Sequence, residues 1–252
     1  MPFAENDLSQ DRFLGGKLTI WQPRAGYRAA TDPVFLAASV PAKAGQSVLE
    51  LGCGAGVALL CLGHRVSGLA LQGIEIQTDY AELAMLNAQR NGLTAGITIA
   101  DLAALPASIT AQSFDHVIAN PPYLTAGAGT AAADAGKETA FRAETSLSVW
   151  VDVAVKRLRP GGLLTMIHLA EKLPALLGSF DARLGDITVK PIAARQGRAA
   201  NRVLVQAQKG SKGPFTLVPP LIVHNGDRHE ADQESYTAEV QRILRDGQAL
   251  PF

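Results

Sequence analysis

A glycine-rich turn between an apolar strand and an apolar helix constrains the fold of this chain more than any other feature of its sequence. The predicted strand covers residues 47–51, the turn has glycine at positions 52, 54 and 56, and the helix runs from Val57 to about Arg65. Glycine is required where the backbone bends sharply at positive φ or passes close to a ligand. A strand, a glycine turn and a helix in this order are typical of the first βα unit of a doubly wound sheet.

Strands and helices continue to alternate after this unit. We expect helices at residues 78–91 and 147–158, and strands at residues 71–76, 97–100, 115–119 and 163–169. Nearly continuous apolar strands separated by helices predict a parallel sheet that is covered on both faces. Two later strands, 187–192 and 202–206, are close in sequence and predict an antiparallel hairpin near the C-terminus. The expected fold is α/β, with a doubly wound, mostly parallel sheet of seven strands.

The length of 252 residues, 47% of them hydrophobic, predicts a single domain. We divide it into an N-terminal cap segment at 1–46, a core at 47–208 and a C-terminal extension at 209–252. The cap segment is expected to hold a short strand at 18–22 and a helix from Thr31 to about Val40, with a proline in its first turn. An amphipathic helix is expected at 237–245.

Charge and cysteine usage narrow the class of protein. The 23 basic and 23 acidic residues cancel, so the whole molecule has no net charge that would attract nucleic acid. Cys53 and Cys61 have neither disulfide nor metal-ligand spacing, and we interpret them as small buried residues. The polar N-terminus lacks a signal peptide and no apolar run approaches the ~20 residues of a membrane span. We therefore expect a cytoplasmic protein without a metal site.

Acidic residues lie at the carboxyl ends of the second and third predicted core strands, at positions suited to a nucleoside. Glu75 lies about twenty residues beyond the glycines, where a carboxylate can accept hydrogen bonds from both hydroxyls of a ribose. Asp101, after the third strand, is placed to contact an adenine amino group. No lysine follows the glycines, which excludes a P-loop. The pattern leaves open a dinucleotide, another nucleotide or S-adenosylmethionine.

The sequence Asn120-Pro121-Pro122-Tyr123 directly after the fourth core strand decides among these ligands. Together with the glycine turn, it resembles the amino-methyltransferase branch of the class I methyltransferases, which use S-adenosylmethionine. This resemblance covers roughly residues 15–210 and implies a Rossmann-like methyltransferase fold. It implies that the motif is catalytic. The implied cofactor contacts are Asp32, Glu50, Gly52, Gly54, Gly56, Glu75, Ile76, Asp101 and Asn120.

The motif has a chemical reason. An exocyclic amine conjugated with a ring is a poor nucleophile, because its lone pair is delocalised. If Asn120 Oδ1 and the Pro121 carbonyl each accept an N–H hydrogen bond, they favour the developing positive charge and aim the lone pair at the methyl group. The prolines stiffen the loop, and Tyr123 offers a ring on which a base can stack. The motif therefore predicts methyl transfer to a planar nitrogen.

A closer resemblance is to the bacterial methyltransferases that modify N6 of an adenosine beside the anticodon of a valine tRNA. It rests on Gly26-Tyr27-Arg28-Ala29-Ala30-Thr31-Asp32-Pro33, on the motif at Asn120 and on Arg159-Pro160-Gly161-Gly162. It implies an RNA substrate. The loop at 125–143, rich in alanine and glycine, departs from this family. Release-factor glutamine methyltransferases and guanine N2 methyltransferases carry related motifs, and both remain alternatives.

A basic stretch near the C-terminus supplies a candidate RNA contact. No acid occurs between Asp186 and Asp227. Basic side chains gathered on one surface bind phosphates in a sequence-independent way, although a solvated basic hairpin has the same pattern. The residues that we expect to contact RNA phosphates are Arg195, Arg198, Arg202, Lys209 and Lys212. The sequence leaves the oligomeric state open.

Overall fold

The computed structural model describes residues 3–123, 146–226 and 235–252, and the loop expected at 125–143 lies outside them. The strands are β1 (Leu8–Phe13), β2 (Leu18–Pro23), β3 (Ser47–Leu51), β4 (Ala70–Glu75), β5 (Ala95–Ile99), β6 (Phe114–Ala119), β7 (Leu158–Leu169), β8 (Leu184–Ala193), β9 (Ala200–Lys209), β10 (Thr216–Leu217) and β11 (Leu221–Ile222). The α-helices are α1 (Asp32–Ser39), α2 (Val57–Arg65), α3 (Thr78–Arg90), α4 (Ala107–Thr110), α6 (Leu147–Arg157), α7 (Leu173–Gly178) and α8 (Ala238–Gln241). Short helical turns are η1 (Glu5–Asp7), η2 (Leu14–Gly16), η3 (Leu102–Ala104), η4 (Ala170–Lys172) and the π-helical η5 (Arg242–Asp246).

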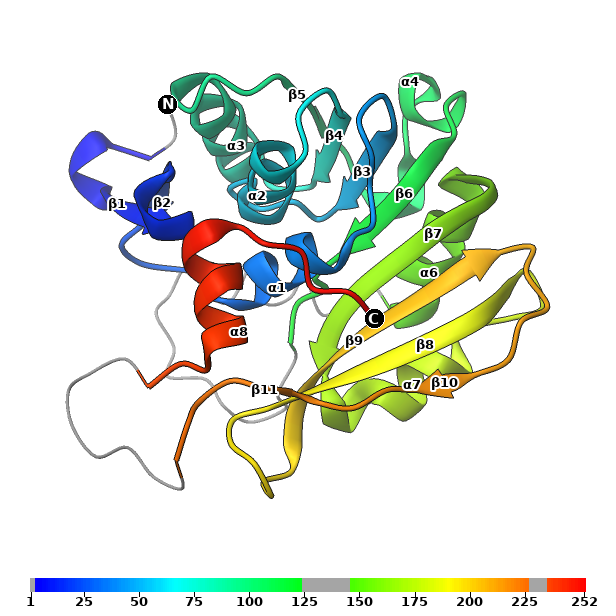
Figure 1. Ribbon diagram of the computed structural model, residues 1–252. Coiled ribbons are helices and arrows are strands. Elements are labelled where there is room, and N and C mark those ends of the chain that lie inside the picture. The colour runs from blue at the N-terminus through cyan, green and yellow to red at the C-terminus, as the bar shows by residue number, and fades with distance from the viewer. Residues whose placement is uncertain (1–2, 124–145, 227–234) are drawn as a thin grey trace.

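One large sheet forms the centre of the molecule (Figure 1). Its strand order is β10-β8-β9-β7-β6-β3-β4-β5, and β11 also pairs with β8. Within this sheet β9 is antiparallel to both of its neighbours, and every other pairing is parallel. The expected α/β fold with a C-terminal antiparallel hairpin is confirmed. Strands β3 to β9 are the seven predicted ones, and the two-residue strands β10 and β11 widen the sheet at the β8 edge.

Both faces of the sheet are covered, as the continuous apolar strands predict. Neighbouring residues of one strand belong to different hydrophobic clusters: Val48 packs in one cluster and Leu49 in the other. The first cluster lies under α1, α2 and the C-terminal helical turns, and the second under α6 and α7. Figure 1 shows α1 and α8 on one side of the sheet and α6 and α7 on the other. Successive side chains of a strand therefore point to opposite faces of the sheet and pack into the two clusters in turn.

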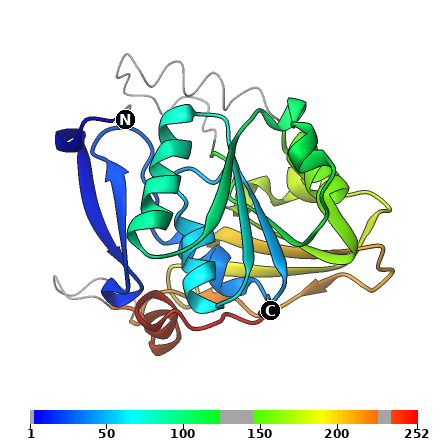
Figure 2. The same cartoon turned by 90° about the horizontal axis from the view of Figure 1, so that it is seen from above.

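A two-stranded antiparallel ribbon, β1–β2, lies apart from the main sheet and beside α3 (Figure 2). The sequence predicts β2 but not β1, because the β1 sequence LSQDRF is mostly polar. The ribbon is anchored by side-chain amides of α3. Asn87 accepts from the Trp21 N–H (2.8 Å) and donates to the Trp21 and Ala55 carbonyls (both 3.0 Å), and Asn91 bonds Thr19 in the same way. The ribbon is thus tied to the glycine turn.

The C-terminal extension packs back on the core. The helix expected at 237–245 corresponds to α8 followed by η5. Thr237 caps α8 by accepting from the Val240 N–H. Val240 and Ile243 are buried in the first cluster. The Leu250 N–H donates to the Ala38 carbonyl of α1 at 2.8 Å.

The cysteines and the helix lengths bear on two of the expectations from the sequence. Cys53 and Cys61 are both free and buried, which confirms them as small buried side chains, and burial raises the pKa of both thiols. Within the described ranges, no helix is both long and apolar enough to cross a membrane.

Candidate functional site

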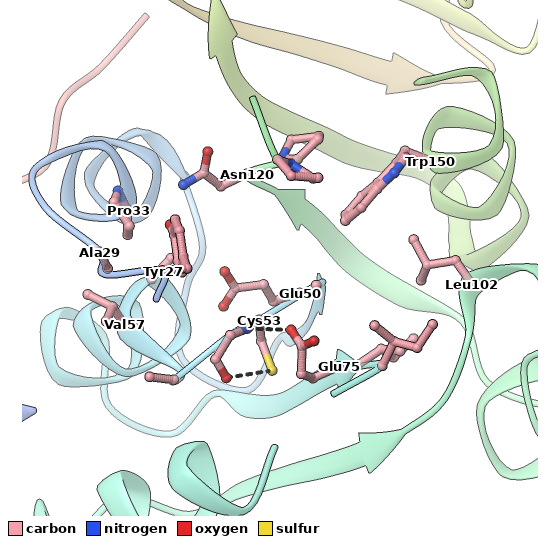
Figure 3. A pocket seen from close by; sticks show the side chains of 18 of the residues that line it. Tyr27, Ala29, Pro33, Glu50, Cys53, Val57, Glu75, Leu102, Asn120 and Trp150 are labelled. Carbon is pink, nitrogen blue, oxygen red and sulfur yellow. Dashed lines mark hydrogen bonds between the residues drawn. The ribbon is translucent and has the colours of Figure 1, made fainter. Parts of the chain in front are cut away.

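A pocket opens at the carboxyl ends of β3, β4 and β6, where the sequence places the candidate residues. It holds about 960 Å³ of space, including the part open to solvent. Figure 3 shows Glu50, Glu75, Asn120 and Trp150 around the same opening. The expected site residues that line it are Glu50, Gly52, Gly54, Glu75, Ile76, Asp101, Asn120, Pro121, Pro122 and Tyr123. The structure therefore brings most of the predicted site together.

The glycine turn is shaped by positive φ angles and by close packing. Gly52, Gly54 and Gly56 have φ values of 63°, 53° and 86°. A Cβ on Gly52 would lie 2.6 Å from Cη2 of Trp150, so the indole occupies the space that a side chain would need. Gly56 precedes α2 as its N-terminal cap residue and is not among the described residues that line the pocket.

Two buried carboxylates hold the turn from the two strands beneath it. Glu75 Oε2 accepts from the Gly54 N–H at 2.8 Å, and Oε1 accepts from the Gln77 N–H at 3.0 Å. Glu50 Oε2 accepts from the Leu59 N–H in the first turn of α2, at 2.9 Å. Burial raises the pKa of Glu50 well above its ordinary value, and the charge of Glu75 raises it further. The desolvated Glu50 carboxyl favours a cationic ligand, because a positive charge offsets the cost of its ionisation.

The far wall of the pocket comes from β4, β5 and α6. Asp101 is exposed and caps η3 by accepting from the Ala103 N–H at 2.9 Å. Ile76, Leu102 and Trp150 supply the apolar surface beside it. Flat apolar walls next to a carboxylate suit a purine ring whose amino group is hydrogen-bonded.

The pocket-lining residues that reasoning from the sequence missed include Trp150, Gln22 and Tyr27. Trp150 lies in α6, far from any motif, and only the small size of Gly52 opposite hints at it. Gln22 and Tyr27 come from the cap segment. Gln22 fixes the loop by bonding both the N–H (2.7 Å) and the carbonyl (3.1 Å) of Ala29. Tyr27 is 37% exposed over the glycine turn, and its only advance signal is its place in the segment of family resemblance.

The Asn120 motif begins where β6 ends. All six β6 residues are buried, so the strand fixes Asn120 at its carboxyl end. Pro121, Pro122 and Tyr123 continue along the pocket wall. The Tyr123 hydroxyl lies 2.9 Å from Asn120 Oδ1 and 2.8 Å from Asp32 Oδ2. Burial, together with the negative charge of Asp32, raises the pKa of Tyr123, so the phenol keeps its proton.

Asp32 and Arg202 differ from expectation. Among the described residues, Asp32 is not part of the pocket lining, and no side-chain cap bond starts α1. Its carboxylate instead bonds Tyr123 and forms an ion pair with Arg202 Nε at 2.9 Å. The Arg202 guanidinium also lies 4.7 Å from the centre of the Tyr123 ring. Arg202 therefore serves the motif loop, whereas the sequence predicted a phosphate contact.

The basic stretch is split between the two ends of the sheet. The β8–β9 turn contains Arg195 and Arg198, and Arg202 lies near the start of β9. Because Arg202 pairs with Leu169, the last residue of β7, these arginines lie at the edge of the sheet where the parallel strands end. Lys209 lies at the other end of β9, about 23 Å away for seven residues of strand. Its Nζ donates to the Leu158 carbonyl, and Lys212 Nζ to that of Ala182. The five residues do not form one patch.

Comparisons with known proteins agree with this geometry. The family model described as the methyltransferase small domain matches residues 30–178. The chain belongs to this family. A tRNA1(Val) (adenine(37)-N6)-methyltransferase of Porphyromonas gingivalis is 30% identical over 235 residues, covering 86% of this chain and 89% of the relative.

Solved structures share the fold. A predicted O-methyltransferase of Agrobacterium tumefaciens has a TM-score of 0.69 and 24% identity, covering 88% of this chain and 99% of its own. An S-adenosylmethionine-dependent O-methyltransferase of Thermotoga maritima has a TM-score of 0.53 and 17% identity, covering 75% and 68%. The chain therefore has the fold of S-adenosylmethionine-dependent methyltransferases, and its methyltransferase family shows that it is an enzyme. Likeness at this identity shows the fold alone, so it does not identify the acceptor atom.

Proposed function

We propose that this enzyme transfers a methyl group from S-adenosylmethionine to the exocyclic N6 amine of an adenine in RNA, and that the RNA is a tRNA. The observation that carries the proposal is the position of Asn120. Its amide lies at the end of a fully buried strand and lines the same pocket as the acids and the glycine turn. The name of the Porphyromonas gingivalis relative supports the choice of adenine and tRNA.

The residues present fit S-adenosylmethionine. The cofactor supplies an electrophilic methyl group on a positively charged sulfur, and the buried Glu50 carboxyl favours such a charge. We propose that Gly52 and Gly54 allow the backbone to approach the ligand, and that Glu75 binds the ribose. Asp101, Ile76 and Trp150 would hold the adenine. Because the leaving group is already activated, we propose no metal; within the described chain, no three His, Cys, Asp or Glu residues are grouped as metal ligands.

The chain's own groups would prepare the acceptor amine. Asn120 Oδ1 and the Pro121 carbonyl accept its two N–H bonds, which restores lone-pair density on nitrogen. Both acceptors interact more strongly with the cationic nitrogen of the transition state than with the neutral amine, and this difference lowers the barrier. The adenine must first leave its stack to enter the pocket. S-adenosylmethionine bound in this pocket would supply the methyl group, and the amine that accepts it would release one proton to solvent.

The acceptor is tested with methyl-labelled S-adenosylmethionine and separate pools of tRNA, rRNA and release factor. We expect label in tRNA, recovered as N6-methyladenosine after digestion. Label recovered only in release factor, or as N2-methylguanosine in rRNA, would replace the proposal with the corresponding alternative. An RNA substrate also implies that the enzyme acts in the cytoplasm.

The role of Asn120 is tested separately. Asn120→Ala should reduce transfer by about 10²-fold or more, the loss typical for a transition-state hydrogen-bonding group. Cofactor affinity, measured by calorimetry, should stay within a few-fold of the wild type. A large loss of cofactor binding with little loss of turnover would contradict the assigned role.

A further inference from the structure

The phenol of Tyr123 faces two acceptors and has one proton. Its oxygen lies 2.8 Å from Asp32 Oδ2 and 2.9 Å from Asn120 Oδ1. A hydroxyl donates one hydrogen bond and can accept others. An ionised carboxylate is a much stronger acceptor than an amide oxygen. The proton is therefore donated to Asp32, and the phenol oxygen presents lone pairs to the Asn120 side chain.

Arg202 holds this carboxylate in place. Its Nε donates to the same Asp32 oxygen at 2.9 Å, and both side chains are largely shielded, at 26% and 22% exposure. The guanidinium stacks on the Tyr123 ring, 4.7 Å from its centre, a cation–π contact that fixes the ring plane. The His168 ring meets the ring of Tyr123 edge to face at 5.2 Å and is itself held by the Leu169 N–H.

The direction of the phenol proton decides how the Asn120 amide is turned. The two ends of an amide have the same shape, so the neighbours decide which end faces which. Opposite a phenol oxygen that acts as an acceptor, the favourable amide end is the NH₂ group. In this orientation Oδ1 and Nδ2 exchange the positions that the structure gives them, so Oδ1 points away from Tyr123, toward the side of the pocket where Figure 3 shows Pro33 and Tyr27. That orientation leaves Oδ1 free to accept from the target amine.

We infer that Asp32 is a positioning residue, which, with Arg202, directs the phenol of Tyr123 and through it aims Asn120 Oδ1 at the target nitrogen. This inference rests on the proposed use of Asn120 as an acceptor. It assigns Tyr123 a second task besides offering a face to the base. It also links three elements: α1, the loop after β6, and β9. Asp32 of α1 and Arg202 of β9 are 170 positions apart in the sequence.

The decisive experiment is a double-mutant cycle of Asp32→Asn and Tyr123→Phe. Phenylalanine keeps the ring but removes the hydroxyl, and asparagine keeps the size of Asp32 but removes its charge. Each single change should lower kcat about 10-fold at saturating cofactor and leave the cofactor Kd unchanged. In the Tyr123→Phe background, Asp32→Asn should cause almost no further loss, because the path to Asn120 is already broken.

Controls separate positioning from folding. Asp152→Asn is a matched variant, because Asp152 also pairs with two cations, Lys156 at 2.7 Å and Arg183 at 2.9 Å, but lies outside the pocket lining. It should leave kcat unchanged. Melting temperatures show whether Asp32→Asn is folded, and where it is not, Arg202→Gln replaces it in the cycle.

The outcomes are distinct from those of the proposed function. The cycle is measured on whichever substrate accepts label from the wild type, so a failure with RNA leaves the inference testable on that substrate. Additive losses in the cycle, or a kcat of Asp32→Asn equal to that of the wild type, would overturn the inference while leaving the acceptor assignment intact.

Discussion

Gly52, in the turn after β3, is restricted both by its backbone conformation and by a neighbouring side chain. Gly52 has a positive φ and also lies against Trp150, whereas Gly45 has a positive φ of 84° and open space, with no atom of the described residues within 4 Å of where an added methyl group would lie. The two glycines therefore allow backbone strain to be distinguished from crowding. Of these two, only the crowded one lines the pocket.

Gly45→Ala should lower the free energy of unfolding by about 1–2 kcal/mol, the cost of a left-handed backbone for alanine. Gly52→Ala should lose about 1–3 kcal/mol more, because the new methyl group displaces the indole. It should also weaken cofactor binding. Urea unfolding and calorimetry measure the two effects, and equal losses at both positions would show that Trp150 yields without cost.

The pKa of Glu50 makes stability depend on pH. Burial raises this pKa above the ordinary value of 4.5, so the native state binds the proton more tightly than the unfolded state. The stabilisation is complete below 4.5 and is lost as pH rises through the native pKa. Relative to Glu50→Gln, which cannot ionise, the wild type should become less stable as pH rises above 4.5.

Urea titrations of the two proteins over a pH series test this expectation. Glu82→Gln, a change at an exposed carboxyl of α3, controls for the removal of one acidic group. A stability difference between wild type and Glu50→Gln that stays constant with pH would contradict the assignment.

Among the elements, the β1–β2 ribbon depends on side chains of α3, which hydrogen-bond main-chain groups of β2. Asn87 is fully buried and serves both main-chain groups of Trp21 as well as the Ala55 carbonyl. Asn91, one turn later, is only partly buried and bonds Thr19. The spacing of four residues places both amides on one face of the helix.

Asn87→Ala should reduce the free energy of unfolding by about 2–4 kcal/mol, because it leaves several buried groups without partners. Asn91→Ala is the matched control and should lose about 1 kcal/mol, since water can replace its bonds. Hydrogen exchange at the Trp21 amide should accelerate in the first variant only. Unchanged exchange there would mean that the ribbon is held by other contacts.

The same elements show what a sequence can predict. The central strands β3 and β6 were predictable because burial on both faces makes them nearly continuous apolar runs. Strand β1 was not, because its burial pattern leaves one residue fully buried and the rest partly or fully exposed. The glycine turn, the acids and the Asn120 motif were local patterns. The contacts of Asp32 with Arg202 and of Gly52 with Trp150 join distant segments, and no local pattern encodes them.

Across the whole molecule, the basic residues divide between two edges of the sheet. Arg198 is exposed at the β8–β9 turn, and the neighbouring Arg195 donates to the Gly226 carbonyl at 3.0 Å. This turn lies at the same edge as the pocket. Lys212 lies at the opposite edge, so we expect an RNA whose base enters the pocket to contact the arginines rather than Lys212.

An Arg195→Glu/Arg198→Glu variant should bind tRNA at least about 10-fold more weakly at low salt. The slope of log affinity against log salt should fall by about 2, one unit for each lost phosphate contact. Lys156→Glu/Lys212→Glu carries the same charge change at the other edge and should match the wild type. Filter binding at several salt concentrations measures both. Equal weakening by the two variants would indicate non-specific attraction.

The reversed direction of β9 also sets the order in which a newly made chain completes its site. Because β9 is antiparallel to β7, its first residues lie at the pocket edge and Arg202 reaches Asp32. The glycine turn, the acids and the Asn120 motif have all left the ribosome well before that strand. A nascent chain thus contains the residues proposed for methyl transfer, whereas Arg202 reaches Asp32 and Tyr123 only once β9 lies between β7 and β8. The contacts around Tyr123 are therefore complete only when the last long strand of the sheet has been added.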